Sequence, residues 1–205
     1  MRETSEDAPA ASRAPDRARY SNGERRREQI IEAAVEIFAE QGYTATSLRA
    51  IAERAGTSHV SLKHHFGTKE AIFQRVLEHR FALDRVARQQ SIPGAGILEI
   101  AGMMMRRNME SPELLQLDAT LTAEAIAPEH PAHDYILRTQ EDFVAEVAPT
   151  LAHEQKAGRI RAELDPTVVA RQLNGLIQGI QVQWLYNRKL DMELHVRTFL
   201  ELLRP

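Results

Sequence analysis

A short run of polar side chains has the composition of a surface that contacts nucleic acid. His59, Ser61, Lys63 and His64 supply hydrogen-bond donors and a cation, with no apolar stripe among them. Such groups bind base edges and phosphates when a helix carries them into a major groove. The same run also fits the solvated face of an ordinary helical hairpin, and spacing alone does not separate the two interpretations.

Two short helices are expected to position these side chains. The first is indicated by apolar residues at three- and four-residue spacing: Leu48, Ile51, Ala52 and Ala55. Thr46 or Ser47 provides a hydroxyl to cap its start, and Gly56 is free to close its end. Ser58 then caps a second helix that runs to about His65. Two short helices joined by a turn that contains Gly predict a helix-turn-helix.

Longer segments around this unit carry a family resemblance. In order, they read IIEAAVEIFAEQGYTATSL, IAERAGTS, SL..HF and GTKEAIF. Across 29–73 the chain thereby resembles the TetR/AcrR family of bacterial transcription regulators. It departs from the family pattern at Lys63, where Tyr is usual, and at Val60, where a small residue or Pro is common.

The resemblance implies a sequence-specific regulator, a repressor by expectation, that binds double-stranded, near-palindromic operator DNA. We expect Arg49, Lys63 and Lys69 to contact backbone phosphates, and His59 and Ser61 to contact base edges. The full set of candidate DNA contacts is Thr46, Ser47, Arg49, Thr57, Ser58, His59, Ser61, Lys63, His64 and Lys69.

The charge is distributed unevenly along a chain whose net charge is −3. Residues 1–80 carry 13 Lys and Arg against 12 Asp and Glu, whereas residues 81–205 carry 13 against 17. Residues 41–69 have a net charge of +3 and also hold three His. A local basic face on an acidic body argues against binding driven by bulk charge and fits a small DNA footprint.

The composition also sets the expected compartment. The chain has no Cys, which excludes disulfides and thiolate metal sites. No apolar signal segment opens the sequence, and no run of about 18 uncharged apolar residues predicts a membrane span. We therefore expect a cytoplasmic protein without a membrane partner.

The rest of the chain predicts an all-α fold of about nine helices. Residues 1–20 are expected to form a flexible arm, 21–68 the DNA-binding domain, and 69–205 a ligand-binding and dimerisation domain. Residues 21–24 fit a capping box that opens the first helix, with three Arg crowding its start. By resemblance, the helix over about 69–90 links the two domains and passes on a ligand signal.

Five further helices are expected beyond a break at residues 91–94. They cover about 96–109, 112–127, 132–156 and 166–186, and a last helix capped by Asp191. Pro149 should kink or split the third of them. In proteins of the resembled family the last two helices pair with their copies in a second subunit. Accordingly, the predicted homodimer interface is Leu173, Gly175, Ile177, Gly179, Ile180, Trp184, Val196, Phe199, Leu200 and Leu203.

A small-molecule effector is expected to bind among the middle helices of the carboxy-terminal domain. Met and aromatic side chains with a few amides are the usual lining of such a site and favour a hydrophobic or aromatic compound. The candidates are Met104, Leu117, Leu121, Tyr135, Phe143, Asn174, Gln178 and Gln181.

Other chemistry finds little support in the sequence. His130 and His133 lack an obvious third metal ligand, so neither a metal nor another cofactor is expected. Neither a phosphate-binding Gly loop nor a nucleophile–base set is recognisable, so we expect no enzyme. Three functions remain, in falling order: a ligand-responsive regulator, a regulator whose carboxy-terminal domain only dimerises or binds a protein, and a small helical enzyme.

Overall fold

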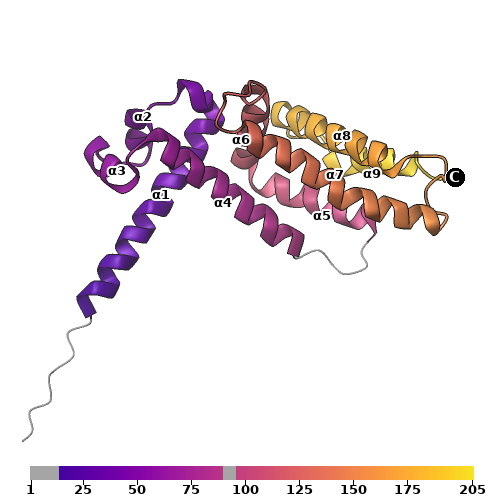
Figure 1. The fold of residues 1–205 in the computed structure, drawn as a ribbon, viewed down its shortest axis with the longest axis horizontal. Coiled ribbons are helices and arrows are strands. Elements are labelled where there is room, and N and C mark those ends of the chain that lie inside the picture. Colours follow the sequence, from indigo (N-terminus) through magenta and orange to yellow (C-terminus); the bar gives the residue numbers. More distant parts are fainter. Residues whose placement is uncertain (1–13, 90–95) are drawn as a thin grey trace, which may run out of the picture.

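The computed structural model describes the backbone of residues 14–89 and 96–205, and the side chains of residues 23–80 and 96–205. The described residues form nine helices and no strand, so the all-α prediction is confirmed (Figure 1). Within these ranges no helix is long and apolar enough to cross a membrane. The helices are α1 (Ala14–Ala45), α2 (Leu48–Arg54), α3 (His59–Phe66), α4 (Lys69–Gln89), α5 (Ile97–Glu110), α6 (Pro112–Glu124), α7 (His133–Lys156), α8 (Pro166–Tyr186) and α9 (Met192–Glu201).

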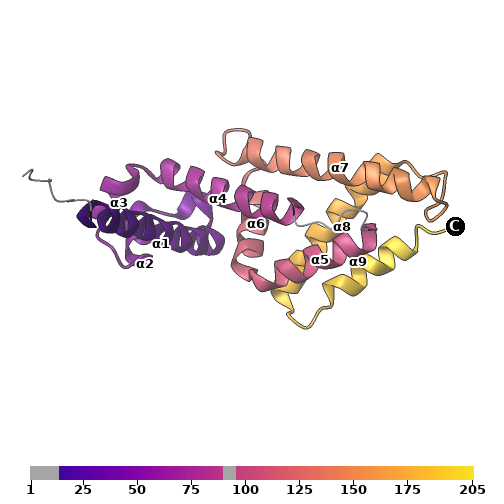
Figure 2. The ribbon, with the colours of Figure 1, turned by 90° about the horizontal axis from the view of Figure 1, so that it is seen from below.

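The helices form two groups along the long axis of the molecule. Helices α1 to α3 and the start of α4 occupy one end, and α5 to α9 occupy the other (Figures 1 and 2). Helix α4 runs from the first group towards the second. The amino-terminal half of α1 projects beyond the rest of the described chain (Figure 1).

Local signals in the sequence determine the ends of the short helices. Ser47 Oγ accepts a hydrogen bond from Ala50 N at 3.2 Å, and Ser58 Oγ accepts one from Ser61 N at 3.0 Å. Each bond satisfies an N–H that the first turn of a helix leaves unpaired. Gly56 has a φ of 58° after α2, a value that side chains disfavour. The predicted caps and stop of the helix-turn-helix are therefore confirmed.

Helix α1 begins earlier than predicted. It starts at Ala14, so residues 14–20 belong to a helix and the capping box at 21–24 does not open it. Two Ala and two Arg in 14–20 favour a helix, and Pro15 is tolerated in its first turn, so the helix begins here and continues through Gly23 until Gly42 interrupts it. The first 13 residues of the expected arm, and the expected break at 91–94, lie outside the described residues.

Helix α7 is not split at Pro149, which excludes one of the two outcomes expected there. The helix runs as one element from His133 to Lys156. A Pro inside a helix removes one backbone hydrogen bond, and α7 keeps its helical course while it packs against α8.

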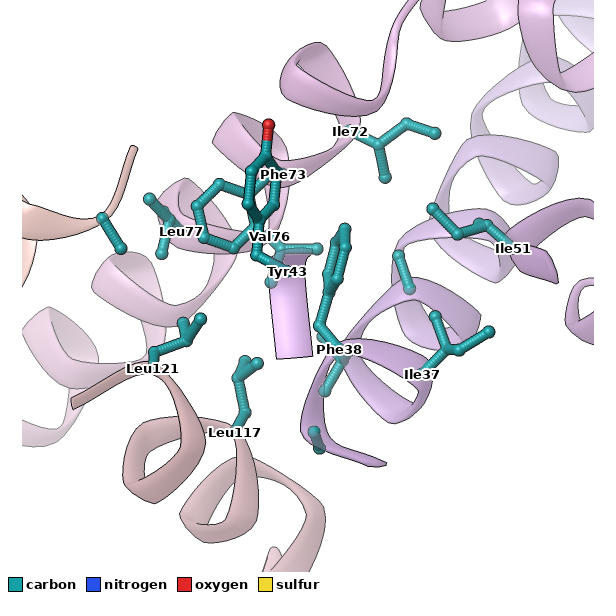
Figure 3. Close-up of a cluster of buried hydrophobic side chains, with 14 of the residues drawn as sticks. Ile37, Phe38, Tyr43, Ile51, Ile72, Phe73, Val76, Leu77, Leu117 and Leu121 are labelled. Carbon is teal, nitrogen blue, oxygen red and sulfur yellow. The ribbon is translucent and has the colours of Figure 1, made fainter. Parts of the chain in front are cut away.

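Two hydrophobic cores hold the two groups of helices. The first joins α1 to α4 with α6 and the start of α7, and its centre is Phe38 and Phe73, whose ring centroids lie 5.2 Å apart (Figure 3). The second joins α5, α7, α8 and α9. Helix α6 belongs to both cores, since Leu117 and Leu121 pack in the first and Leu115 packs in the second.

Candidate nucleic-acid interface

Helix α3 presents one polar face to solvent. Leu62 is fully buried and holds the helix against α1, α2 and α4. On the other sides His59, Lys63 and His64 are exposed and Ser61 is half-buried. The structure thus brings the four polar residues of the predicted recognition helix to the surface of the amino-terminal group.

Helix α2 and the turn before α3 add further polar groups to this surface. Arg49 is exposed, and Thr57 is half-buried in the turn. Ser47 and Ser58 are exposed, although each hydroxyl oxygen already accepts a capping bond. A hydroxyl that accepts a bond still has its own proton to donate, so both can also donate to a phosphate.

Two predicted DNA contacts, Thr46 and Lys69, make hydrogen bonds inside the chain. Thr46 is only 3% exposed, and its hydroxyl donates to the Gly42 carbonyl at 2.6 Å. Lys69 Nζ donates to the Tyr43 carbonyl at 2.9 Å and lies 4.2 Å from the centre of the Tyr43 ring. Thr46 and Lys69 therefore both position the turn before α2. The buried Thr46 is removed from the DNA contacts, whereas the ammonium of Lys69 has three donors and can still bind a phosphate.

Arg54 is also used internally, which reduces the free positive charge of residues 41–69. Its guanidinium binds Glu36 at 3.1 Å and Glu40 at 2.5 Å on α1. The hydrogen bond from Arg54 lowers the pKa of Glu40 below its usual value. Of the four cations in this segment, Arg49 and Lys63 are exposed, and Lys69 is half-buried with N–H donors beyond its bond to Tyr43.

Helix α1 contributes a second group of cations beside α3. Burial lowers the pKa of His65, and the positive charges of His64, Arg27 and Arg26 lower it further. Arg26 also donates to the Gly56 carbonyl at 2.9 Å in the turn between α2 and α3. These Arg lie in the middle of α1 rather than at its start, so the expected penalty from the helix dipole does not apply.

Lys63 gives the first prediction. We expect Lys63→Ala to weaken binding to all duplex sequences alike and to reduce the slope of log affinity against log salt by about one. The reason is that each neutralised phosphate releases counterions. Filter-binding titrations over a salt series measure this slope. Lys189→Ala, which removes an exposed Lys beyond α8, is the matched control; an unchanged slope for Lys63→Ala would exclude a phosphate contact.

The predicted effector residues do not meet in one place. Leu117 and Leu121 are each 1% exposed and pack against α1 and α4 in the first core (Figure 3). Tyr135 is half-buried against the same core, whereas Met104 and Phe143 are half-buried against the second. Helix α8 carries the three amides, which are half-buried: Asn174, Gln178 and Gln181.

Leu117 and Leu121 are therefore removed from the candidate effector site. Periodicity shows that Leu117 and Leu121 share the apolar face of α6, but that face docks on the DNA-binding end of the molecule. Two shallow hollows on the described surface are lined by none of the eight candidates. One, of about 240 Å³, lies between α5 and α9 beside Gly102 and Glu193, and the other, of about 120 Å³, lies beside Asn108 and Leu114.

The predicted dimer stripe is likewise covered by the chain itself. Leu173, Ile177, Ile180 and Trp184 on α8 are buried in the second core, as are Val196, Leu200 and Leu203 at the end of the chain; Phe199 is half-buried against it. These side chains are not available to a second subunit. The strongest apolar stripe of a helix packs first against its own domain.

The outer face of α8 carries a second, weaker stripe. Gly175 and Gly179 are exposed there, and nothing lies within 4 Å of a Cβ added at either. Val168 is 52% exposed, Val182 39% and Tyr186 89%, at positions that share the face of the glycines. Helix α9 and its end add Leu194 and Leu202, which are exposed as well. From Val168 to Tyr186 these residues are spaced by seven, four, three and four positions, a helical periodicity from which this face could have been predicted.

The pair of His considered for a metal has other partners. His133 Nδ1 lies 2.8 Å from the Ala125 carbonyl, and His130 Nδ1 accepts a bond from Ala132 N at 3.1 Å. Among residues 23–80 and 96–205 no group of three or more metal-binding side chains occurs.

Comparison with known proteins covers both ends of the molecule. Residues 30–76 match the model of bacterial regulatory proteins of the tetR family. Residues 93–205 match the carboxy-terminal model of BetI-type transcriptional repressors. The first match ends within α4, and the second begins before α5.

Individual relatives span most of the chain. The HTH-type transcriptional regulator SrpR of Pseudomonas putida is 26% identical over 85% of this chain and 82% of its own length. The HTH-type transcriptional repressor KstR2 of Rhodococcus jostii is 26% identical over 78% and 79%. A solved structure described as the molecular basis for control of antibiotic production by bacterial hormones is 27% identical, with a TM-score of 0.62 over 86% of this chain and 94% of that one.

Proposed function

The chain belongs to the TetR family of transcription regulators, and we propose that it is a homodimeric repressor released from a near-palindromic operator by a small hydrophobic or aromatic molecule. As a helix-turn-helix regulator of this family it binds operator DNA and is not an enzyme. Its place of action is the cytoplasm, where the operator is found.

The observation that supports operator reading best is the outward polar face of α3. A major groove admits an α-helix, and donors on its exposed side reach base edges. In this arrangement His59 and Ser61 contact bases, while Arg49 and Lys63 bind phosphates on either side. Ser47, Thr57, Ser58 and His64 complete the contact surface: the hydroxyls donate to phosphates and the imidazole lies at the groove edge.

The second subunit covers the outer face of α8 and the exposed Leu of α9. Two-fold pairing through this face places Gly175 and Gly179 against a partner helix, and the absence of a Cβ permits a close approach. A two-fold dimer presents two α3 helices to successive major grooves, which is why the operator is near-palindromic.

An effector is supported by the half-buried Met104, Phe143 and α8 amides, and by the relative whose title names bacterial hormones. These groups combine apolar area with a few hydrogen-bonding positions, as ligand sites do. The alternative, a carboxy-terminal domain that only dimerises, is favoured by one observation: neither described hollow is lined by any candidate effector residue.

One experiment tests the proposal in two stages. Duplexes selected by the protein from fragmented genomic DNA should share a two-fold symmetric sequence and bind in a salt-dependent manner. A panel of aromatic and long-chain aliphatic compounds is then screened for a rise in melting temperature and for release of the selected duplex. Selection of no common sequence would contradict the proposal, and sequence selection without any releasing compound would favour the dimerisation-only alternative.

His59 provides a prediction on specificity. His59→Ala should relax discrimination at one base pair of each half-site, at a loss of about 1–3 kcal/mol, because a base-edge hydrogen bond disappears. Binding of each single-base operator variant measures the change. His195→Ala, an exposed His on α9, serves as the control. Equal discrimination at all positions would remove His59 from the base contacts.

A further inference from the structure

Helix α1 is interrupted at Gly42, just before the helix-turn-helix. Gly42 has φ 77° and ψ 172°, which is not helical. In an unbroken α-helix the N–H of Tyr43 donates to the carbonyl of Ala39, four residues earlier. The break therefore leaves a donor and an acceptor that need other partners, because buried backbone groups are costly to leave unpaired.

Three side chains of α6 bind these two groups. Glu124 Oε2 accepts a hydrogen bond from Tyr43 N at 2.7 Å. Gln116 Nε2 and Thr120 Oγ1 both donate to the Ala39 carbonyl, at 3.2 and 3.1 Å. A carbonyl has two lone pairs and accepts both bonds. Gln116, Thr120 and Glu124 are spaced by four residues, so they form one row along α6, which we call the α6 row.

The fit between this row and the break is close. A Cβ added at Gly42 would lie 2.1 Å from Glu124 Oε1, so only a glycine admits the carboxylate here. His130 lies on the other side of the carboxylate, and its Nε2 is beyond hydrogen-bond distance. Its Nδ1 accepts a bond from Ala132 N, so the neutral ring carries its proton on Nε2, 3.6 Å from Glu124 Oε2.

The segment that follows the break is bound to α4 and leads directly into α2. The Tyr43 hydroxyl donates to Glu70 at 3.1 Å, and its ring lies 4.5 Å from that of Phe73 on α4. Burial, followed by the Glu70 carboxylate, raises the pKa of Tyr43 to about 12, so the phenol keeps its proton. Thr46, which precedes the first residue of α2, donates to the Gly42 carbonyl. A shift of the Gly42–Tyr43 turn would therefore move α2 relative to α1 and α4.

We propose that the α6 row positions the helix-turn-helix for operator binding, because it supplies the hydrogen bonds that the break in α1 leaves unmade. Gln116, Thr120 and Glu124 are positioning residues: they contact no DNA and act through the Gly42–Tyr43 turn. Helix α6 also packs in the core of the carboxy-terminal domain through Leu115. Any molecule that displaces α6 thereby changes the direction of α3. This inference rests on the proposed function, and it assigns the link between the domains to α6 and α1 in addition to α4.

Variants of the row test the positioning role. Glu124→Leu keeps the volume but removes the acceptor of Tyr43 N, and Thr120→Val removes one donor to Ala39. We expect each to lower affinity for the selected operator, Glu124→Leu by roughly tenfold or more, because an unsatisfied N–H favours another arrangement of the turn. Affinity for an unrelated duplex should not change. Glu124→Gln retains an acceptor and should restore most of the operator affinity.

Asp118→Ala is the matched control on the same helix. Asp118 accepts hydrogen bonds from Arg80 on α4 at 2.7 and 3.1 Å, so its loss weakens the attachment of α6 without touching the break in α1. It should lower thermal stability as much as Thr120→Val does, yet leave the ratio of operator to unrelated-duplex affinity unchanged. If Asp118→Ala lowered that ratio as much as the variants of the α6 row do, the row would have only a general structural role. That result would overturn the proposal.

Distance measurements test the geometry without DNA. The chain has no Cys, so Val60→Cys on α3 and Leu137→Cys on α7, both exposed, give two specific spin-label sites. Dilution with unlabelled protein isolates the distance within one chain. We expect Glu124→Leu to shift or broaden this distance, and Asp118→Ala to leave it unchanged. An unshifted distance together with wild-type operator affinity in Glu124→Leu would overturn the inference. Failure of the wild type to select any duplex would contradict the proposed function alone, because the distance measurement needs no operator.

Discussion

Gly179→Asp is expected to produce a folded monomer with a much lower affinity for its operator. Gly179 is exposed on the outer face of α8, and nothing lies within 4 Å of an added Cβ, so a single chain accommodates the side chain. In the proposed dimer the same side chain would meet its copy across the two-fold axis. A carboxylate buried there without a partner costs several kcal/mol per ion, which is enough to separate the subunits.

Loss of the dimer removes one of two half-sites, so we expect operator affinity to fall by about 100-fold or more while non-specific binding persists. Sedimentation at micromolar concentration measures the mass, thermal melting confirms the fold, and a mobility shift measures binding. Ala145→Asp, which places the same charge on the exposed face of α7, should leave the mass and the affinity unchanged. A stable Gly179→Asp dimer would place the interface elsewhere.

The helix-turn-helix could be predicted from sequence because its signals are local. Ser47, Ser58 and Gly56 act on the N–H or carbonyl groups of their immediate neighbours, and a capping residue identifies a helix end without knowledge of the fold. The start of α1 was missed for the opposite reason. Ser21, Asn22 and Gly23 resemble a helix start, but none of them must stop a helix, and Ala and Arg before them extend it to Ala14.

Periodicity correctly identified the apolar faces of α6 and α8 but not what covers them. Leu117 and Leu121 do share a face, yet that face packs against α1 and α4 rather than around a ligand. Trp184 and Ile180 do form a stripe, yet their own domain covers it. A sequence pattern shows which side chains avoid water, whereas the partner surface depends on contacts between distant segments.

The hydrogen bonds that polar side chains make within the tertiary fold could not be predicted from the sequence either. Lys69 was predicted only as a phosphate contact, and its hydrogen bond to the Tyr43 carbonyl had no signal in the sequence. Thr46 looked like a second cap, but it donates back to Gly42. Both partners belong to the turn after the break in α1, whose path no local signal describes. The part of the interface that could be predicted is thus the part carried by α3 itself.

Gly42→Ala is expected to destabilise the protein more than any other glycine-to-alanine change we consider. Its φ and ψ lie in a region used almost only by glycine, which alone costs about 1–3 kcal/mol for another residue. The added Cβ also collides with the Glu124 carboxylate and breaks its bond to Tyr43 N, a charge-assisted bond worth roughly 1.5–3 kcal/mol. Together these give a loss of about 2.5–6 kcal/mol in the free energy of unfolding.

Alanine substitutions at two other glycines separate the conformational cost from the collision with Glu124. Gly56 has a φ of 58° but open space around an added Cβ, so Gly56→Ala should cost only the conformational part, about 1–2 kcal/mol. Gly23 lies within α1, has no positive φ and has open space, so Gly23→Ala should stabilise by about 0.5–1 kcal/mol. Urea unfolding of the three variants gives the order; equal losses at Gly42 and Gly56 would mean that Glu124 adds nothing.

A double-mutant cycle then isolates the contact between Gly42 and Glu124. Glu124→Ala removes the carboxylate that the new Cβ would strike, so Gly42→Ala should cost less in that background than in the wild type. The conformational part remains in both backgrounds, because it depends only on φ and ψ. The difference, about 0.5–3 kcal/mol for residues in contact, measures how strongly α6 is matched to the break in α1. Additive losses would mean that the carboxylate moves aside freely, and then α6 could not hold the turn that directs α3.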